Sequence, residues 1–377
     1  MTVIAYAVSD THIPAEADAG AWKDLPGVSG DALFALGQVV ALCVRDHVPL
    51  LAAGDLVDDP DVEPAALAAW FSVMRPLQDA GLPVLAILGN HDRSRDWLAA
   101  FGPTAVRLDG RTVTLPSGHT VSGLSWVPND RFAEAVAGIS RYTDIGLYHQ
   151  PLADLTGRGV NASQLPPHRL AVVGDTHVAT TLTPPAGPKL VLSPGPLAPQ
   201  SVAEFGPPGV WAVHDDLSVS RVSLPHRAWH SFLIDSPAAA DACVAACGAL
   251  APDPALPDLV ARPLVAVRLT ADVDGFVPTV RELARSRDFA LRVLDAGPGR
   301  VDHPSPAPAP PRGADLAEAL RLRLPADPGA LELALELAAP GADPLSVLAA
   351  ARARDAAEAA PAVYESEDES HAYEEAS

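Results

Sequence analysis

The sequence predicts an α/β protein, and three observations carry that prediction. Apolar segments with strand character lie at residues 2–9, 48–53 and 82–88, and helical patterns separate them at 32–46 and 63–80. This alternation of strands and helices is typical of a sheet with parallel strands. With 48% hydrophobic and 19% charged residues, the 377-residue chain has enough apolar side chains for a large core, which excludes a wholly disordered protein.

Local patterns support each of these elements in turn. Residues 2–9 alternate and are rich in β-branched side chains, which favours a strand. The helix at 63–80 carries Pro64 in its first turn, where a missing amide hydrogen is tolerated. Further short strands, the last two flanking a His-Asp-Asp turn as in a β-hairpin, are predicted at 170–174, 189–192, 210–213 and 217–222.

A smaller unit is predicted after the composition changes near residues 225–235. Strand, helix and strand patterns at 264–269, 276–286 and 289–294 indicate a compact βαβ-like unit. Proline and alanine then alternate over 304–311, which is typical of a semi-rigid linker.

The C-terminal part of the chain is predicted to hold two or three helices and a disordered acidic tail. The helical stretches lie at 314–324, 329–337 and 344–360. The predicted divisions of the whole chain are residues 1–230, 231–300, 301–313 for the linker, 314–361 for the helices and 362–377 for the tail.

Charge and cysteine content restrict the class of protein. There are 26 Lys and Arg against 47 Asp and Glu, a net charge of −21, which argues against binding nucleic acid by net charge alone. Cys43, Cys243 and Cys247 form no disulfide framework, which fits a reducing compartment. Cys243 and Cys247 share one helical face and are expected to be small buried apolar residues rather than ligands.

The sequence predicts neither a membrane span nor a signal peptide. No uninterrupted run of about 18 apolar residues is present. The N-terminus lacks a basic region and a cleavage site, so we expect a cytoplasmic protein.

Polar clusters follow the predicted strands, at the strand ends where parallel α/β sheets place their sites. They are Asp10-Thr-His12, Gly54-Asp55, Gly89-Asn-His-Asp92, His149-Gln-Pro151 and Gly174-Asp-Thr-His177. Each cluster alone is equally explained by a turn, a helix cap or a hydrogen-bonded histidine. Five of them in this order, each behind an apolar run, indicate a common site, and mixed carboxylate, amide and imidazole groups suit Mn²⁺ and similar divalent ions.

This order of motifs resembles the calcineurin-like metallophosphoesterase superfamily over about residues 1–230. The segments farther along the chain resemble the SbcD family of DNA repair nucleases, and a phage-type or diverged member of that family also fits. These segments are Ser193-Pro-Gly-Pro196, Glu204-Phe205 and Pro225-His-Arg-Ala-Trp-His230. The resemblance implies a β-sandwich flanked by helices, in four layers (αββα). It also implies that the unit at 231–300 is a small α+β capping domain and that the C-terminal helices bind a coiled-coil ATPase.

The resemblance also implies two metal sites and a proton donor. One site would use Asp10, His12, Asp55 and His177, and the other Asp55, Asn90, His149 and Asp175. A shared carboxylate such as Asp55 holds two ions, here Mn²⁺ or alternatively Mg²⁺, about 3.5–4 Å apart. His91 is implied to protonate or stabilise the leaving oxygen. Asp92 either orients His91 or caps the helix that follows it.

The chain departs from the family pattern at Asp175. The family usually has a Gly-His-x-His motif where this chain has Gly174-Asp-Thr-His177, so a carboxylate replaces a histidine ligand. The added negative charge is expected to shift the site toward harder ions. Arg93 and Arg95 either contact DNA phosphates or belong to a solvated helix start.

Three hypotheses about function follow. The first is a metal-dependent DNA nuclease that hydrolyses phosphodiester bonds at DNA ends as a homodimer with an SbcC-like ATPase. The second is a small-molecule phosphodiesterase or phosphatase of the same superfamily, for which the acidic charge is less awkward. The third is a scaffold protein that keeps the fold without turnover. Leucines of the C-terminal helices fit docking on a partner or packing on the nuclease core, and they are Leu316, Leu320, Leu322 and Leu324.

Overall fold

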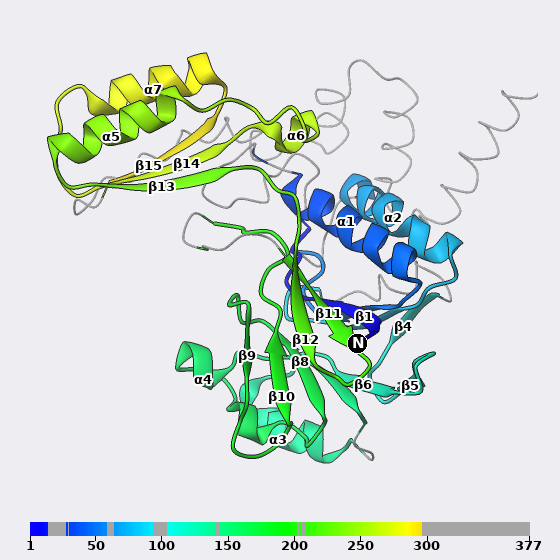
Figure 1. Ribbon diagram of the computed structural model, residues 1–377. Helices are drawn as coiled ribbons and strands as arrows, with labels where there is room; N and C mark the ends of the chain where they lie inside the picture. The colour runs from blue at the N-terminus through cyan, green and yellow to red at the C-terminus, as the bar shows by residue number, and fades with distance from the viewer. Residues whose placement is uncertain are drawn as a thin grey trace, which may run out of the picture. The chain divides into compact units, whose positions relative to one another are not determined.

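The computed structural model (Figure 1) describes residues 1–13, 28, 30–58, 64–92, 104–139, 143–201, 204 and 209–295. The predicted linker at 301–313, the C-terminal helices at 314–361, the tail at 362–377, and Arg93 and Arg95 lie outside the described residues. The domain boundaries of the sequence analysis therefore stay predictions. Among the described helices, none combines the length and apolarity that crossing a bilayer requires.

The first sheet contains six strands in the order β12-β11-β1-β2-β3-β4. They are β1 (Val3–Val8), β2 (Leu50–Ala53), β3 (Val84–Ile87), β4 (Ala105–Arg107), β11 (Gly209–His214) and β12 (Val219–Ser223). Strands β1 to β4 are parallel, whereas β11 pairs antiparallel with β1 and with β12. The predicted parallel sheet is therefore a mixed sheet, because the predicted hairpin β11-β12 returns to pair with β1.

The second sheet also has six strands, in the order β5-β6-β7-β8-β10-β9. They are β5 (Thr112–Thr114), β6 (Thr120–Leu124), β7 (Ile145–His149), β8 (Leu170–Gly174), β9 (Thr180–Leu182) and β10 (Leu190–Ser193). The four central strands are parallel, and both edge strands are antiparallel to their neighbours. In each sheet the parallel strands therefore have their carboxyl ends at the same edge. The residues that follow these strands lie along that edge.

The two sheets pack face to face between two layers of helices. Alternate residues of β2 show this directly: Leu50 and Ala52 pack with the helix layer, while Leu51 and Ala53 pack against the second sheet. The helices are α1 (Asp31–Asp46) and α2 (Pro64–Asp79) on the first sheet, with α3 (Asn129–Ala137), α4 (Ala153–Thr156) and the 3₁₀ turn η2 (Ala162–Gln164) beside the second. Strands buried on both faces are apolar throughout, which is why they were readable from the sequence. The predicted four-layer αββα fold is confirmed.

A third sheet of three parallel strands forms the smaller unit (Figure 1). Its elements are β13 (Trp229–Ile234), α5 (Pro237–Gly248), α6 (Asp258–Ala261), β14 (Leu264–Leu269), α7 (Phe276–Arg287) and β15 (Ala290–Asp295). The predicted strand-helix-strand pattern is confirmed, and β13 is an additional strand. Cys243 and Cys247 are free and buried in its core, with their sulfur atoms 3.9 Å apart, as expected of small apolar residues.

Arg227 connects helix α1 with the smaller unit through a buried ion pair. Its Nε donates to Asp31 Oδ1 over 2.7 Å, and its terminal nitrogens donate to the carbonyls of Leu259 and Arg262 over 2.9 and 3.2 Å. Only 4% of Arg227 is exposed. Removing one partner of such a pair leaves a buried charge and costs about 3–5 kcal/mol, so Arg227 is a structural residue of this junction.

A buried histidine, His168, lies just before β8 of the second sheet, at the opposite end of that strand from the Gly174-Asp-Thr-His177 motif. His168 Nδ1 lies 2.8 Å from the carbonyl of Thr143, and Nε2 lies 2.7 Å from the hydroxyl of Tyr148. These contacts define a neutral ring whose Nδ1 donates and whose Nε2 accepts. Burial lowers the pKa of His168 below its ordinary value, since the charged form would lose its hydration.

We therefore predict that His168 makes the fold less stable as the pH falls. Below about pH 6.5 the unfolded chain takes up a proton at this residue that the folded chain does not, so the free energy of unfolding decreases. Between pH 7 and 5 the decrease is expected to be about 1 kcal/mol larger in the wild type than in His168→Gln. Urea unfolding at each pH measures this difference, and parallel curves for the two proteins would contradict the prediction.

Candidate metal centre

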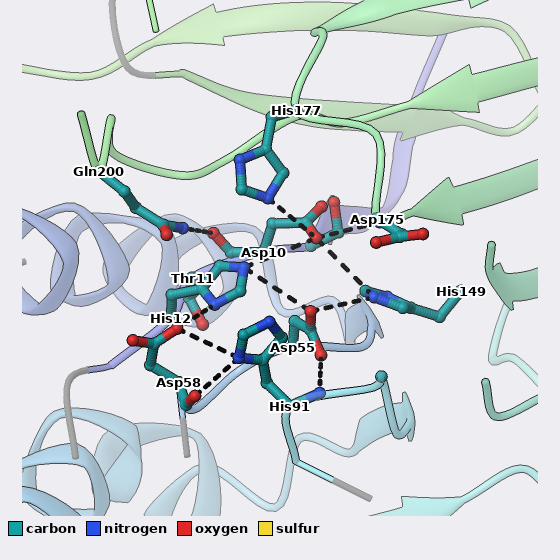
Figure 2. Close-up of polar contacts among 12 residues, drawn as sticks. Asp10, Thr11, His12, Asp55, Asp58, His91, His149, Asp175, His177 and Gln200 are labelled. Atoms are coloured by element: carbon teal, nitrogen blue, oxygen red, sulfur yellow. Dashed lines mark hydrogen bonds and ion pairs between the residues drawn. The ribbon is translucent and has the colours of Figure 1, made fainter. Parts of the chain in front are cut away.

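The predicted motifs meet at one place, where strand ends of both large sheets converge (Figure 2). The first sheet brings Asp10 and His12 after β1, Asp55 after β2 and Asn90 after β3. The second sheet brings His149 at the end of β7, and Asp175 and His177 after β8. Asp10 and His149 are fully buried, and 2% of Asp55 is exposed.

Two carboxylate oxygens form the middle of this cluster. Asp55 Oδ2 lies 3.2 Å from His149 Nε2 and 3.7 Å from His12 Nε2. Asp10 Oδ1 lies 3.8 Å from His177 Nε2 and 4.0 Å from the Nε2 atoms of His12 and His149. Atoms this close, each offering a lone pair, are spaced as ligands of a common ion would be. Both Asp10 and Asp55 face histidines of the two predicted sites, so each of these carboxylates is placed as a shared ligand would be.

Each of the three predicted histidine ligands is held by its other ring nitrogen. The Nδ1 atoms contact Asp58 Oδ1 at 2.9 Å for His12, the carbonyl of Ala53 at 2.7 Å for His149, and Glu204 Oε1 at 3.0 Å for His177. An acceptor at Nδ1 holds a ring proton there, so Nε2 is the atom whose lone pair a metal would use in place of a second proton. All three rings therefore present a ligand atom to Asp10 and Asp55.

Orphaned polar atoms provide a direct test of whether the residues fit a metal. Among the described residues, four predicted ligand atoms are buried without a hydrogen-bond partner, and they are Asp10 Oδ2, His12 Nε2, Asn90 Oδ1 and His149 Nε2. Buried polar atoms are nearly always paired, so unpaired ligand atoms call for a missing partner, and three of these four belong to Asp10, His12 and His149, whose side chains lie together in the cluster. A divalent cation satisfies carboxylate, amide and imidazole atoms together. The residues fit a metal centre.

The backbone is strained at the residues that carry the site. Asp10, His12, Asp55 and Asp175 have positive φ angles of 51°, 41°, 50° and 75°. Side chains other than glycine rarely adopt this left-handed region, and such strain concentrates at functional sites. Four of the seven predicted ligands share the same uncommon conformation, which turns each side chain off its strand end and toward the centre.

Two motif glycines leave the space that the ligands occupy. A Cβ atom on Gly89 would lie 2.0 Å from Asp55 Oδ1. Gly54 has a φ of 88°, and a Cβ there would lie 2.4 Å from His149 Nδ1. Any larger residue would displace a predicted ligand, which explains why glycine precedes the ligands in these motifs.

The centre has an excess of negative charge. Burial alone would lower the pKa of His149, but the carboxylates of Asp55 and Asp10 raise it to about 10. Burial likewise opposes ionisation of Asp55, yet His149 and His12 lower its pKa to about 2. The potential at this place therefore favours positive charge strongly, and bound cations would take the place of the histidine proton.

Asp175 lies at the edge of the same centre. Its backbone amide donates to Asp10 Oδ1 over 3.0 Å, and Figure 2 shows its carboxylate on the side of His149. Burial raises the pKa of Asp175, and the charges of Asp10 and Asp55 add to the increase. A third carboxylate thus stands near two others, an arrangement that a divalent cation would stabilise.

His91 lies beside the cluster and is oriented by Asp58, a residue that the sequence analysis did not identify. His91 Nδ1 lies 2.7 Å from the carbonyl of Asp58 and 3.4 Å from Asp58 Oδ1. The rings of His91 and His12 meet edge to face, with their centres 4.9 Å apart. Since the backbone carbonyl accepts from Nδ1, the Nε2 atom of His91 is the one available to a substrate.

Asp92 connects two loops instead of orienting His91. Its two oxygens accept from the amides of Gly89 and Leu56, at 2.5 and 2.9 Å. Burial raises the pKa of Asp92 to about 6, and the charge of Asp55 adds to this. The residue that contacts His91 is Asp58, not Asp92. The alternative, a cap for the helix after Asp92, falls on residues 93–100, which lie outside the described residues.

A further combination of possible ligands shares one ring with the cluster. His12, Asp58 and His91 also lie close enough together to bind an ion. In this set, however, the short contacts are those of the Nδ1 atoms of His12 and His91 with oxygens of Asp58, which are the distances of hydrogen bonds. His12 could bind a second ion through Nδ1 only if it lost the proton on that atom. We therefore interpret Asp58 as an acceptor.

Glu204 is the second residue without a predicted role. It belonged to a segment identified only through the family resemblance, and no spacing rule placed it near His177. Asp58 follows Asp55 by three residues, and this Asp-x-x-Asp spacing after a buried strand was the one available signal.

Comparison with known proteins identifies the class. Residues 5–220, more than half of the chain, match the calcineurin-like phosphoesterases. The chain belongs to this family, whose members hydrolyse phosphoesters with two divalent metal ions.

Two relatives show a narrower similarity. The chain is 39% identical over 106 residues to the DNA double-strand break repair protein Mre11 of Haloferax volcanii, which covers 27% of this chain and 24% of the relative. It is 28% identical over 216 residues to the protein of the same name from Halobacterium salinarum, covering 52% of this chain and 55% of the relative. The resemblance to SbcD-like nucleases is thereby confirmed at modest identity, although the chain spans only a quarter to about half of these relatives.

We predict that Gly89→Ala abolishes metal binding at this centre. The new methyl group would overlap Asp55 Oδ1 and displace the predicted shared ligand. Calorimetric titration with Mn²⁺ measures the loss, which is expected to exceed tenfold in affinity. Gly248→Ala is the matched control, because a Cβ atom there meets nothing within 4 Å. Equal Mn²⁺ binding by both variants would show that Asp55 does not hold the ions.

Proposed function

We propose that this chain is a metal-dependent DNA nuclease that hydrolyses phosphodiester bonds at DNA ends, as part of an SbcCD-like repair or recombination complex. The observation that carries the proposal is the convergence of carboxylates and histidines from both sheets, with four ligand atoms unpaired, in a member of the calcineurin-like family. The similarity to two proteins named for DNA double-strand break repair supports DNA as the substrate.

We assign the residues the roles that the family resemblance implies. Asp10, His12, Asp55 and His177 would hold one ion, and Asp55, Asn90, His149 and Asp175 the other. Two divalent ions bound there, Mn²⁺ or alternatively Mg²⁺, supply the Lewis acidity that phosphodiester hydrolysis needs at neutral pH. The charged form of His91, with Nδ1 donating to the Asp58 carbonyl, carries a proton on Nε2 that it gives to the leaving oxygen.

The position of His91 suits this task. Its side chain is 37% exposed, whereas that of His12 beside it is 3% exposed. A residue that donates a proton to a substrate must be reachable, while a metal ligand is better kept from water. His91 is thus more exposed than each of the three predicted histidine ligands, of which His177 is 29% exposed and His12 and His149 are almost fully buried.

One observation favours a second candidate function. The net charge of −21 does not assist the approach of DNA. A small-molecule phosphodiesterase or phosphatase would use the same centre and meet this difficulty less. The third candidate is a scaffold protein that has lost catalytic turnover. In that case Asp175, in place of the usual histidine ligand, would mark the loss of the active site.

The assembly and location are part of the proposal. We infer that the chain acts as a homodimer with a coiled-coil ATPase of the SbcC type, which the C-terminal residues 314–361 would bind. Its substrate would place it in the cytoplasm, and the three free, buried cysteines agree with a reducing compartment.

Cleavage assays decide among the three functions. With Mn²⁺, the purified chain is expected to degrade linear duplex DNA. His91→Ala should slow this about 100-fold or more while it retains metal, because a positioned acid contributes 10²–10⁴ in rate. Asp55→Asn should lose both cleavage and metal binding. A chain that cleaves bis-p-nitrophenyl phosphate but leaves DNA intact with every metal is a small-molecule enzyme, and one that cleaves neither is a scaffold.

The carboxylate of Asp175 is expected to set the choice of metal. We predict that the wild type prefers Mn²⁺ and Mg²⁺ over Zn²⁺, since a carboxylate is a hard oxygen ligand. Asp175→His should move the preference toward Zn²⁺, as an imidazole suits that ion better. Competitive titration of both proteins with the three ions measures the order, and an identical order would exclude a role for Asp175 as ligand.

A further inference from the structure

The loop after β10 contacts both halves of the candidate metal centre. This loop, residues 194–204, is described except for residues 202 and 203. Although β10 belongs to the second sheet, Pro196 forms a β-bridge with Ser9 at the end of β1 in the first sheet. Farther along, Gln200 Nε2 donates to the carbonyl of Asp10 over 3.4 Å (Figure 2). The loop thus reaches across from one sheet to the strand that carries Asp10.

Glu204 ends this loop with both carboxylate oxygens engaged. Oε1 lies 3.0 Å from His177 Nδ1, and Oε2 accepts from the backbone amide of Gln200 over 2.9 Å. The side chain of Glu204 is 22% exposed and that of His177 is 29% exposed, so the pair is partly shielded from water. One carboxylate therefore joins the loop that touches Asp10 to the histidine that faces Asp10.

His177 depends on such a contact more than the other two rings do. It follows β8 in the second sheet, and its Nε2 faces Asp10 Oδ1 of the first sheet at 3.8 Å. His12 and His149 are buried to 97% and 100%, so packing restricts their rings. The ring of His177 is more exposed, so a hydrogen bond must fix its orientation and the position of its proton.

We propose that Glu204 is a positioning residue that fixes the ring of His177, and the proton on its Nδ1, so that His177 can bind a divalent ion together with Asp10. This inference rests on the proposed function, since it concerns the same centre. Glu204 touches neither the substrate nor the metal pair in this proposal. It acts through His177. Because the loop after β10 contacts the first sheet, Glu204 holds His177, a predicted ligand from the second sheet, in a fixed position relative to the first sheet.

The isosteric variant Glu204→Gln separates this role from simple stabilisation. A glutamine offers one oxygen and one NH₂ group in place of two acceptors. If the NH₂ group faces the Gln200 amide, two donors oppose each other. If it faces His177 Nδ1, it selects the form with the proton on Nε2, the atom that the metal needs. Either arrangement weakens metal binding, and partners of this kind are worth 10- to 100-fold in affinity.

Asp144 provides a matched control for the change from a carboxylate to an amide. Its Oδ2 accepts from the amide and the hydroxyl of Thr120 over 3.0 and 2.9 Å, at the start of β7, whereas His149 stands at the other end of that strand. Asp144→Asn therefore makes the same carboxylate-to-amide change without touching the centre, since its remaining oxygen can accept both hydrogen bonds and the charge that it loses faces Arg169 at 3.7 Å. Glu204→Asp, which keeps two acceptors on a shorter stem, covers the case in which Glu204→Gln does not fold.

The experiment uses the full chain, stripped of metal and titrated with Mn²⁺ by calorimetry and with Co²⁺ by visible absorption. We expect Glu204→Gln to bind both ions 10- to 100-fold more weakly with an altered Co²⁺ spectrum, Glu204→Asp to be intermediate, and Asp144→Asn to match the wild type. Equal affinities and spectra for wild type and the folded Glu204 variants would overturn this proposal alone. A wild-type chain that binds no divalent ion would overturn the proposed function as well.

Discussion

The confinement of negative charge at the ends of two sheets determines much of this structure. Asp10 and Asp55 are almost completely removed from water, and Asp175 stands beside them. A buried carboxylate without a counter-charge is costly, so the centre is stable only when positive charge occupies it. In the chain alone His149 fulfils this need, which is why its pKa rises to about 10. A pair of divalent cations would meet it more fully.

Several local features follow from that confinement. Turning four side chains inward at strand ends requires left-handed backbone at Asp10, His12, Asp55 and Asp175. This strain is tolerated because the surrounding backbone is fixed. Amides of Asp10 and His12 donate to the carbonyls of Gly54 and Asp55, over 3.1 and 3.0 Å, so the segments after β1 and β2 continue to support each other. The rigid sheets hold the ligands, and the strained turns aim them.

The sequence revealed the parts of this design that depend on local pattern. Doubly buried strands appear as apolar runs, and the polar motifs follow them directly, so the fold and the place of the motifs at the strand ends were predictable, whereas the set of seven ligands came from the family resemblance. Asp58 and Glu204 were not, because a carboxylate that accepts from a histidine of another loop has no periodicity. Strand β13 was missed for a similar reason, since polar residues interrupt its apolar run. The role of Asp92 escaped prediction because its partners are backbone amides of loops that meet only in the folded chain.

The same confinement explains how an acidic chain is compatible with an anionic substrate. Part of the excess charge is internal to the centre, since Asp10, Asp55, Asp58, Asp92, Asp175 and Glu204 all lie in it or beside it. With no cation bound, these groups repel a phosphodiester. Two divalent ions bound there would bring four positive charges, which would offset most of these six negative charges and weaken the repulsion of a phosphodiester. The repulsion that a phosphodiester would meet at a loaded centre is therefore smaller than the overall charge of −21 suggests, because most of the negative charge at the centre would be offset.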